Sequence, residues 1–420
     1  MTDARLRHIQ TLQYADKQTA ESLLLVFICE TFPQLAARAV ELRPSAVSLN
    51  SFNGDLILED GRRLFFKTHV EPDSIVNEYY NSGLLAEAGY PIIRPLYAST
   101  EYGKQFLIYE RIESPSVFEI ARALEVDSGS PLSLAVSLAD LQTAQNRADD
   151  HLYQIYEQTL AEQSAVDAAK APIHQLFYHR LAGARYRDFY GAPDNPLVTL
   201  LDRHWIINGR HYRSTLRELI GLQHKIAPEQ AAMSVIGHGD AHNGNVFYQP
   251  DGLLYFDPAF AGRHNPLLDI AKPLFHNVFA SWMYHPAAHP QALTIRLQAP
   301  FSAQVFGSSG VVDQSQSITM TYDETLPAVR HMFFDSKVER VLTPLVISLK
   351  QRGQLSAEWR LYLKMALLCC PLLTMNLTNL TRFPAEAAWL GASYAIQMGS
   401  ESDGGSSLLD QALNNIEAVL

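Results

Sequence analysis

Cysteine is scarce in this chain of 420 residues. Only Cys29, Cys369 and Cys370 occur, which is an odd number, and two of them are adjacent. This composition argues against a disulfide framework of the kind that stabilises small secreted domains. We therefore expect reduced thiols and a cytoplasmic protein.

Long apolar runs are also missing from the sequence. The longest uninterrupted stretch, from Met365 to Met375, contains Pro371 and Thr374 and is too short to span a bilayer. The first residues lack the basic-then-apolar order of a secretory signal. The sequence therefore predicts no membrane partner.

A surplus of positive charge is missing as well. The chain has 33 Lys and Arg against 44 Asp and Glu, which gives a net charge of −11 and an isoelectric point near 5.7. This balance disfavours broad binding to nucleic acids and is compatible with a cationic substrate. Hydrophobic residues make up 47% of the chain, which is ample for two or three domains or for one two-lobed enzyme.

The most informative segment covers residues 238–245, with the sequence His-Gly-Asp-Ala-His-Asn-Gly-Asn. Twelve residues after Asn245, Asp257 follows the apolar run at residues 253–256. Transfer of a phosphoryl group from ATP to a hydroxyl needs a carboxylate near the acceptor proton and oxygen ligands for the metal that bridges the phosphates. We predict that Asp240 receives the proton and that Asn245 and Asp257 bind Mg²⁺, which favours oxygen donors and retains some of its waters.

Two other interpretations of this segment stay open. Gly, Asn, His and Asp bond to their own backbone and tolerate unusual angles, so the segment can be a simple turn; a turn does not explain an Asp that closes the next apolar strand. His238 and His242 can bind zinc together only if they lie on a helix. Gly239 and Gly244 favour a loop instead.

The segment resembles the catalytic loop of the aminoglycoside phosphotransferase and choline kinase-like families. These families carry His-Gly-Asp where protein kinases carry His-Arg-Asp, and a metal-binding Asn follows five residues after the Asp. Asp240 and Asn245 match this spacing, and Asp257 stands at the position of the second metal ligand. The resemblance implies a protein-kinase-like fold with two lobes and an ATP-dependent activity.

The resemblance also implies roles for other residues near the loop. His238 is expected to brace the loop, and His242 is expected either to pack within it or to contact the substrate. Pro266 is placed where helices often begin. Asp269, four residues into that helix region, resembles the second Asp of the family, which braces the catalytic loop.

A kinase-type site also needs a lysine on a strand far upstream and a Glu on the following helix to position it. Lys67 ends the second strand of a predicted hairpin, after a Glu-Asp-Gly turn. Residues 75–88 then show apolar positions at near-helical intervals and stop at Gly89. Glu78 lies on this helix, and we predict that Lys67 and Glu78 take part in nucleotide binding.

The phosphate-covering loop is predicted at residues 50–55. Ser51, Asn53 and Gly54 are expected to contribute donors there. Protein kinases have three glycines in this loop, whereas this segment has only Gly54. A simple hairpin turn explains the same residues nearly as well.

The hinge between the lobes is predicted after a strand at residues 105–109. Glu110 and Ile112 stand where the backbone of the family pairs with adenine. Because any side chain can occupy such a position, an ordinary buried strand that leads into a loop predicts the same residues.

These patterns predict an α+β fold in two parts. Residues 1–112 form a small β-rich lobe with a helical N-terminal extension that includes residues 35–40. Residues 113–420 form a large helical lobe with the catalytic loop and the metal site. Two strand-like runs near residues 285–325 form an insertion that either contributes to the acceptor pocket or caps the lobe.

The predicted acceptor is the hydroxyl of a small molecule, such as an amino sugar, an amino alcohol or a sugar. No Ala-Pro-Glu tripeptide follows Asp257, and the protein-kinase segment that ends in this tripeptide forms the platform for a peptide substrate. ATP and Mg²⁺ are the predicted cofactors. The alternatives are an inactive nucleotide-binding scaffold, motivated by the glycine-poor loop, and a kinase or nucleotidyltransferase that acts on a protein. The sequence names neither the acceptor nor the oligomeric state.

Overall fold

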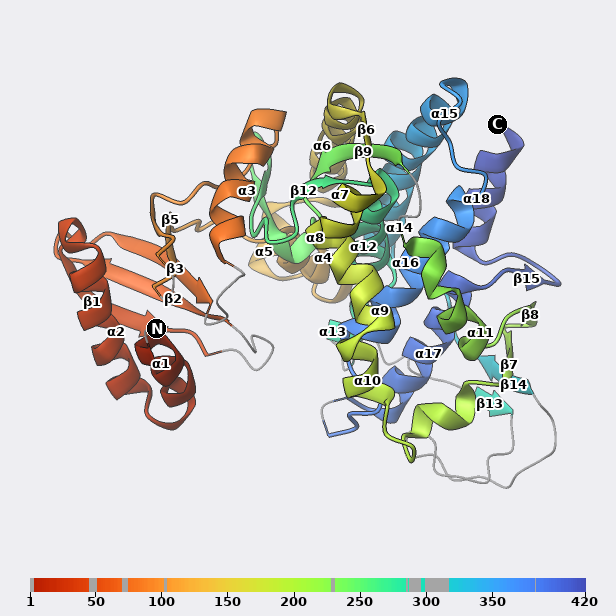
Figure 1. Ribbon diagram of the computed structural model, residues 1–420, viewed down its shortest axis with the longest axis horizontal. Coiled ribbons are helices and arrows are strands. Elements are labelled where there is room, and N and C mark those ends of the chain that lie inside the picture. Colours follow the sequence, from red (N-terminus) through yellow and green to blue (C-terminus); the bar gives the residue numbers. More distant parts are fainter. Residues whose placement is uncertain are drawn as a thin grey trace. The chain divides into compact units, whose positions relative to one another are not determined.

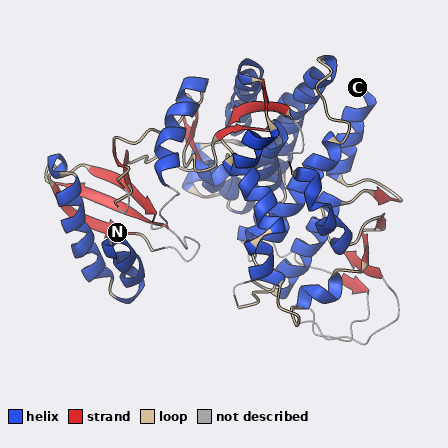
Figure 2. Ribbon diagram, in the orientation of Figure 1, coloured by secondary structure: helices blue, strands red, loops and turns tan. Residues whose placement is uncertain are grey.

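A computed structural model describes residues 4–44, 51–69, 75–101, 104–227, 231–284, 286, 296–298, 317–381 and 383–420. The chain divides into two compact units. The first comprises Met1–Pro115 and Leu254–Ala261, and the second comprises Ser116–Leu253 and Gly262–Leu420. The first unit is built on a β-sheet and the second is mostly helical (Figures 1 and 2). The predicted α+β class, with a small β-rich N-terminal part and a larger helical part, is confirmed.

The first unit contains a sheet in which the described neighbouring strands are antiparallel. The strand order is β1-β2-β3-β5-β4. The strands are β1 (Ala37–Leu42), β2 (Ser51–Leu58), β3 (Arg63–His69), β4 (Tyr97–Ser99) and β5 (Phe106–Glu110). The helices are α1 (Ala4–Ala15), α2 (Lys17–Thr31), η1 (Pro33–Leu35) and α3 (Ile75–Ala88). The predicted hairpin, the helix at residues 75–88 and the strand before Glu110 are therefore confirmed.

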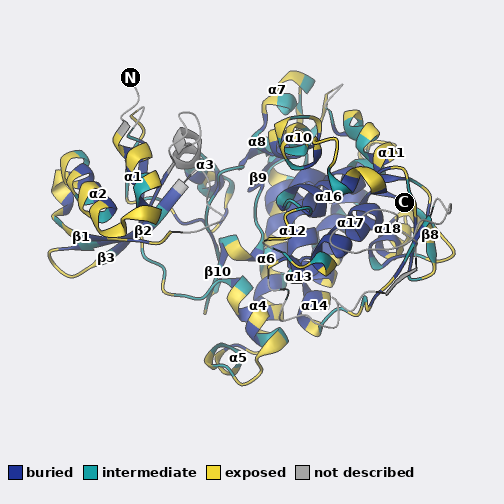
Figure 3. Cartoon of the chain, turned by 90° about the horizontal axis from the view of Figure 1, so that it is seen from below, coloured by how far each residue is buried: buried dark blue, intermediate teal, exposed yellow. Residues whose placement is uncertain are grey.

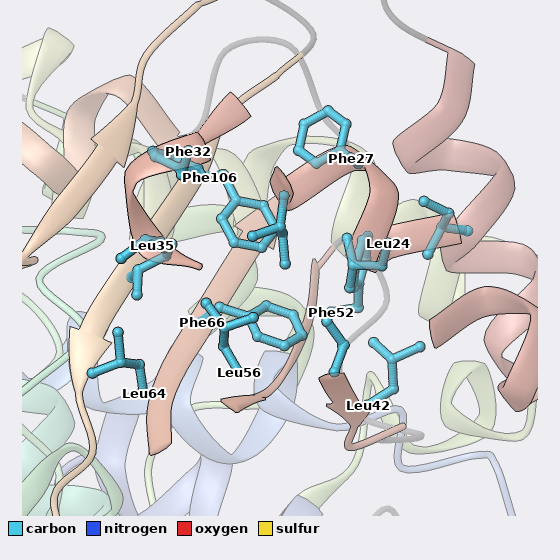
Figure 4. Close-up of a cluster of buried hydrophobic side chains, with 14 of the residues drawn as sticks. Leu24, Phe27, Phe32, Leu35, Leu42, Phe52, Leu56, Leu64, Phe66 and Phe106 are labelled. Atoms are coloured by element: carbon cyan, nitrogen blue, oxygen red, sulfur yellow. The ribbon is translucent and has the colours of Figure 1, made fainter. Parts of the chain in front are cut away.

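The hydrophobic core of the first unit joins α1 and α2 to the sheet. Leu24 and Phe27 of α2 are buried with Phe52, Phe66 and other strand residues (Figure 4). The rings of Phe66 and Phe106 stack with their centroids 5.2 Å apart. Because Phe66 lies one residue before Lys67, its burial fixes the orientation of β3 and directs the next side chain to the opposite face of the strand.

The predicted helix at residues 35–40 is wrong. Pro33 opens a short 3-10 turn, and the chain then continues as β1. Val40 and Leu42 are buried while Glu41 between them is exposed. This alternation has the period of a half-buried strand, which the apolar content of the segment did not reveal.

The predicted loop at residues 50–55 is also wrong, because β2 begins at Ser51. Gly54 pairs with Leu42 on one side and with Phe66 on the other. A Cβ atom on Gly54 would lie 2.2 Å from the carbonyl oxygen of Glu41. Gly54 therefore permits the close approach of β1, which is a structural reason for this glycine. Most of the segment that joins β1 to β2, residues 45–50, lies outside the described residues.

Three helices form the buried centre of the second unit. All residues of α12 (Pro266–Val278) are buried. It packs against α16 (Trp359–Thr374), which also packs against α17 (Ala385–Gly399) (Figure 3). The predicted start of α12 is confirmed: Pro266 lies in its first turn, and the side chain of Asn265 accepts a hydrogen bond from the backbone N–H of Leu267. No helix in the described part of the chain is long and apolar enough to cross a membrane.

The other helices of the second unit surround this centre. They agree with the predicted helical character of residues 113–420, although the short strand β6 (Ala161–Gln163) occurs among them. Their bounds are α4 (Val117–Val126), α5 (Pro131–Ala135), α6 (Leu138–Thr159), α7 (Ala165–Lys170), α8 (Pro172–His174), the π-helix η2 (Gln175–His179), α9 (Arg180–Ala182), α10 (Ala184–Tyr190), η3 (Pro196–Leu200), α11 (Leu216–Gly221), η4 (Leu222–Ile226), α13 (Ser281–Tyr284), α14 (Ala328–Lys337), the π-helix η7 (Val338–Leu342), α15 (Thr343–Gln351) and α18 (Leu408–Ala418).

The remaining strands form small sheets. A three-stranded sheet has the order β12-β9-β6, from β12 (Gly262–His264), β9 (Ala232–Gly237) and β6 (Ala161–Gln163), and β10 (Val246–Gln249) pairs with β11 (Gly252–Tyr255). A further sheet has the order β13-β14-β7-β8-β15, from β13 (Arg296–Gln298), β14 (Ser317–Thr321), β7 (His204–Ile207), β8 (Arg210–Tyr212) and β15 (Ser402–Asp403). The predicted strand pair of the insertion is found as β13 and β14. Residues 287–295 and 299–316 of the insertion lie outside the described residues, and its role stays a prediction.

Candidate active site

The loop at residues 238–245 connects β9 to β10 and is held by its own hydrogen bonds. The ring Nδ1 of the buried His238 accepts from the backbone N–H of Asp240 at 3.3 Å. The Asn245 side chain donates through Nδ2 to the carbonyl oxygen of Asp240 at 3.0 Å. These contacts fix the backbone on both sides of the Asp240 carboxylate.

The zinc interpretation of His238 and His242 is wrong in its geometry. The segment is a loop that ends in the 3-10 turn η5 (Asn243–Asn245) and not an α-helix. The Nδ1 atom of His242 accepts from the backbone N–H of Gly244 at 3.1 Å. Both histidines thus use one ring nitrogen to hold the loop backbone.

Asp269 of α12 anchors the loop from outside. Its carboxylate accepts hydrogen bonds from the backbone N–H of Gly239, from the hydroxyl of Tyr156 and from Nε2 of His264 at 3.2 Å. Burial alone would raise the pKa of Asp269, but these hydrogen bonds and the charge interaction with His264 lower its pKa to about 2. The side chain is therefore a carboxylate at neutral pH, and it holds the loop at residues 238–245 through the backbone of Gly239.

Gly237, the last residue of β9, leaves room for this brace. A Cβ atom at this position would lie 2.5 Å from Nε2 of His264 and 2.7 Å from Cγ of Asp269. We expect Gly237→Ala to destabilise the protein by about 1–3 kcal/mol, because the methyl group must displace buried hydrogen-bonded side chains. Urea unfolding would measure this loss. Gly221→Ala is the matched control, since no atom lies within 4 Å of the added Cβ there; equal effects at both positions would contradict the prediction.

Asp240 has a cationic neighbour that the sequence interpretation missed. Lys272 of α12 forms an ion pair with the Asp240 carboxylate, and the two side chains are only 11% and 14% exposed. Nε2 of His242 lies 3.5 Å from the same carboxylate oxygen. Lys272 stands three residues after Asp269, so helical spacing places both on neighbouring positions of α12. That spacing is the signal that could have identified Lys272.

The first unit, taken by itself, contains a polar pair of its own. Nζ of Lys67 lies 2.6 Å from Oδ1 of Asp257, with 9% and 30% of the side chains exposed. Asp257 has a φ of 56°, in the left-handed region that Asp tolerates better than most residues. The adjacent chain is fixed by hydrogen bonds from Asn81 to the carbonyl oxygen of Pro258 at 3.0 Å and from the backbone N–H of Tyr255 to Pro91 at 2.7 Å. Asp257 lies two residues beyond β11, close to its predicted place at a strand end.

The other predicted nucleotide contacts are placed as follows. Ser51 and Asn53 belong to β2, Glu110 is the exposed last residue of β5, and Ile112 is half-buried in the chain that follows. Glu78 lies in α3, but its side chain is outside the described part of the structure. The nucleotide-binding roles of these residues, and of Gly54, stay predictions.

The chemistry of the two proposed metal ligands fits Mg²⁺. Because Nδ2 of Asn245 must donate to a carbonyl oxygen, its Oδ1 is the atom left for a cation. Asp257 adds a carboxylate. An amide oxygen and a carboxylate are each donor types that Mg²⁺ accepts.

Comparison with known proteins gives distant matches of structure. No family model matches the chain, and no curated protein matches it significantly. An amicoumacin kinase in complex with AMP-PNP and Ca²⁺ is 14% identical, with 86% of this chain and 87% of that chain covered and a TM-score of 0.43. An aminoglycoside phosphotransferase in complex with AMP-PNP and hygromycin B is 12% identical over 90% and 98% of the chains, with a TM-score of 0.41. A choline kinase from Cryptosporidium parvum is 11% identical over 90% and 95%, with a TM-score of 0.39. Because these scores are low, the function below is derived from the residues of this chain.

Proposed function

We propose that this chain is an ATP- and Mg²⁺-dependent phosphotransferase that transfers the γ-phosphoryl group to a hydroxyl of a small molecule. The observation that carries the proposal is the Asp240 carboxylate, which is presented by a loop that His238, Asn245 and Asp269 hold in place. Amino sugars, amino alcohols and sugars are the acceptor classes that follow from the sequence.

Asp240 would orient the acceptor hydroxyl and receive its proton, a contribution that is typically about 10²- to 10⁴-fold in rate. The ion pair with Lys272 and the contact with His242 restrict the rotation of this side chain. Lys67 would bind nucleotide phosphates as a buried cation, with Asp257 beside it. Mg²⁺, held by Asn245 and Asp257, would neutralise phosphate charge when bound.

A direct test is to incubate the purified chain with MgATP and a library of small hydroxyl compounds, and to identify the nucleotide product. A phosphotransferase produces ADP and a phosphorylated acceptor. Production of AMP or pyrophosphate would indicate nucleotidyl transfer instead, and binding of MgATP without any turnover would support the inactive scaffold.

The metal ligands and the lysine are expected to respond differently to magnesium. Asp257→Ala should weaken nucleotide binding on the order of tenfold when Mg²⁺ is present, and much less in its absence, because the carboxylate acts through the metal. Lys67→Ala should weaken binding in both conditions, because an ammonium group attracts phosphate directly. Calorimetric titration of ATP with and without Mg²⁺ would distinguish the two.

Glu59→Ala is a suitable control for these variants, since Glu59 is exposed in the turn after β2. All variants should first be checked for cooperative unfolding, because either substitution breaks the Lys67–Asp257 pair. Wild-type affinity of Asp257→Ala for MgATP would remove Asp257 from the metal site.

A further inference from the structure

Helix α12 contacts the loop at residues 238–245 at a second place, besides the bond from Gly239 to Asp269. The side chain of Asn277 accepts a hydrogen bond through Oδ1 from the backbone N–H of Asn243 at 2.8 Å. Both residues are buried. Asn243 begins the 3-10 turn η5, which ends at the proposed metal ligand Asn245 and packs against α12 and α4. One helix therefore holds the loop near both of its ends.

The bond to Asn277 differs from the other hydrogen bonds of this turn. The backbone N–H of Gly244 donates to Nδ1 of His242, and that of Asn245 donates to the carbonyl oxygen of His242 at 2.8 Å. Both of these bonds stay within the loop and set its local shape. The N–H of Asn243 donates to a residue of another element. Asn277 is therefore a direct link between the turn and α12.

Arg330 of α14 holds Asn277 at the end of its helix. Asn277 is the last residue but one of α12, so its carbonyl oxygen has no partner within the helix. That oxygen accepts a hydrogen bond from Nη1 of Arg330 at 2.9 Å. A cation is favourable at a helix C-terminus, because the free carbonyl groups there carry partial negative charge. The contact fixes the backbone from which the Asn277 side chain extends.

Glu125, near the end of α4, orients the guanidinium of Arg330. Nε and Nη2 of Arg330 lie 3.1 Å and 2.7 Å from Oε2 of Glu125, and each side chain is only 2% exposed. A buried ion pair often adds little net stability, because desolvation offsets the attraction. The planar group nevertheless fixes the direction of Nη1 once Nε and Nη2 are bound. Because α14 packs against both α4 and α12 (Figure 1), the contacts from Glu125 to Asn243 cross three helices.

Resting on the function proposed above, we propose that Asn277 is a positioning residue for the Mg²⁺ ligand Asn245, and that Arg330 and Glu125 set its place. Asn245 follows Asn243 by two residues, so a shift of the turn also moves the Asn245 side chain. Metal ligands depend on the groups that orient them, and the loss of such a group typically weakens metal affinity about 10- to 100-fold. Side chains of α4, α12 and α14 therefore contribute to the metal affinity of the loop.

The first experiment removes the acceptor at residue 277 and follows magnesium. Asn277→Leu is similar in size but cannot accept the hydrogen bond, whereas Asn277→Asp keeps an accepting oxygen. Binding of AMP-PNP to the full chain is measured by calorimetry without Mg²⁺ and over a series of Mg²⁺ concentrations. The Mg²⁺ concentration for half-maximal binding should rise about tenfold or more in Asn277→Leu and stay near the wild-type value in Asn277→Asp. The affinity for AMP-PNP without Mg²⁺ should not change.

A second measurement needs neither metal nor nucleotide. Hydrogen exchange in the free protein, followed by mass spectrometry, reports how well the backbone amide of Asn243 is protected. Exchange of this amide should be about fivefold or more faster in Asn277→Leu than in the wild type, because one hydrogen bond is lost. Asn277→Asp should exchange like the wild type. Unchanged exchange in Asn277→Leu would contradict the inference.

Arg330→Lys tests the outer part of this arrangement. Lysine keeps the positive charge but lacks the planar fork that bonds Glu125 and Asn277 together. The Mg²⁺ dependence should shift in the same direction as in Asn277→Leu, by a smaller factor. Ser336→Ala is the matched control on the same helix, because it removes one buried hydrogen bond, to Asp149 at 2.8 Å. This control should show the Mg²⁺ dependence of the wild type.

Three further results would overturn the inference. One is a wild-type Mg²⁺ dependence in Asn277→Leu or, if that variant does not fold, in Arg330→Lys. Another is the same shift in Asn277→Asp or in Ser336→Ala, which would attribute the shift to lost stability. The third is an equal loss of AMP-PNP affinity with and without Mg²⁺ in Asn277→Leu. Failure of the proposed function is recognised separately, since the wild type would then bind no AMP-PNP or would bind it independently of Mg²⁺.

Discussion

Asp240→Asn is expected to lower kcat by about 10²- to 10⁴-fold and to leave the Kd for MgATP nearly unchanged. The amide has almost the shape of the carboxylate but cannot receive the proton of the acceptor. The backbone contacts that hold the loop involve the N–H and C=O of residue 240 and not its side chain. Steady-state turnover and nucleotide titration on the same preparation would measure both quantities.

Asp251→Asn is the control for this substitution, because Asp251 is exposed in the turn between β10 and β11. The variant at Asp240 also leaves Lys272 without its carboxylate partner. Thermal unfolding must therefore show that Asp240→Asn is folded at the assay temperature. Turnover close to that of the wild type in a folded variant would exclude Asp240 as the proton acceptor.

Asp269→Asn is expected to lower the free energy of unfolding by about 2–4 kcal/mol at neutral pH. It should also reduce turnover, because the loop that presents Asp240 is then held less firmly. The carboxylate accepts hydrogen bonds from Gly239, Tyr156 and His264 in a fully buried site. An amide replaces one accepting oxygen with a donor, so at least one buried donor loses its partner. Urea unfolding at pH 7 would measure the loss.

The pH dependence provides an independent check on Asp269. Its pKa in the folded protein, about 2, is lower than the ordinary value of 3.8. The stabilisation from ionised Asp269 is therefore fully present above about pH 4 and is lost as the pH falls through 2. Its size is about 2 kcal/mol. The difference in unfolding free energy between the wild type and Asp269→Asn should shrink over this range.

Asp335→Asn is the control for this series, because Asp335 is exposed on α14. Its stability should follow that of the wild type from pH 6 to pH 2. A constant difference between the wild type and Asp269→Asn over the whole range would show that the folded protein does not lower the pKa of Asp269.

The sequence by itself determined the parts of this protein that depend on short-range patterns. The spacing from Asp240 to Asn245 identifies a loop, because glycines and polar residues at these positions satisfy the backbone locally. The hairpin that carries Lys67 and the helix that ends at Ala88, just before Gly89, follow from turn and stop signals. Such signals lie within a few residues of the elements that they define.

Only the tertiary structure decided which distant residues meet. The close approach of the β1 backbone explains why residue 54 is a glycine. Residues 37–42 form the strand β1 because the side chains of Val40 and Leu42 pack into the hydrophobic core. Lys272 acquires its partner Asp240 from another element. The sequence alone does not show whether a charged side chain is buried or which residue it pairs with. Burial and pairing together determine how that charged side chain behaves.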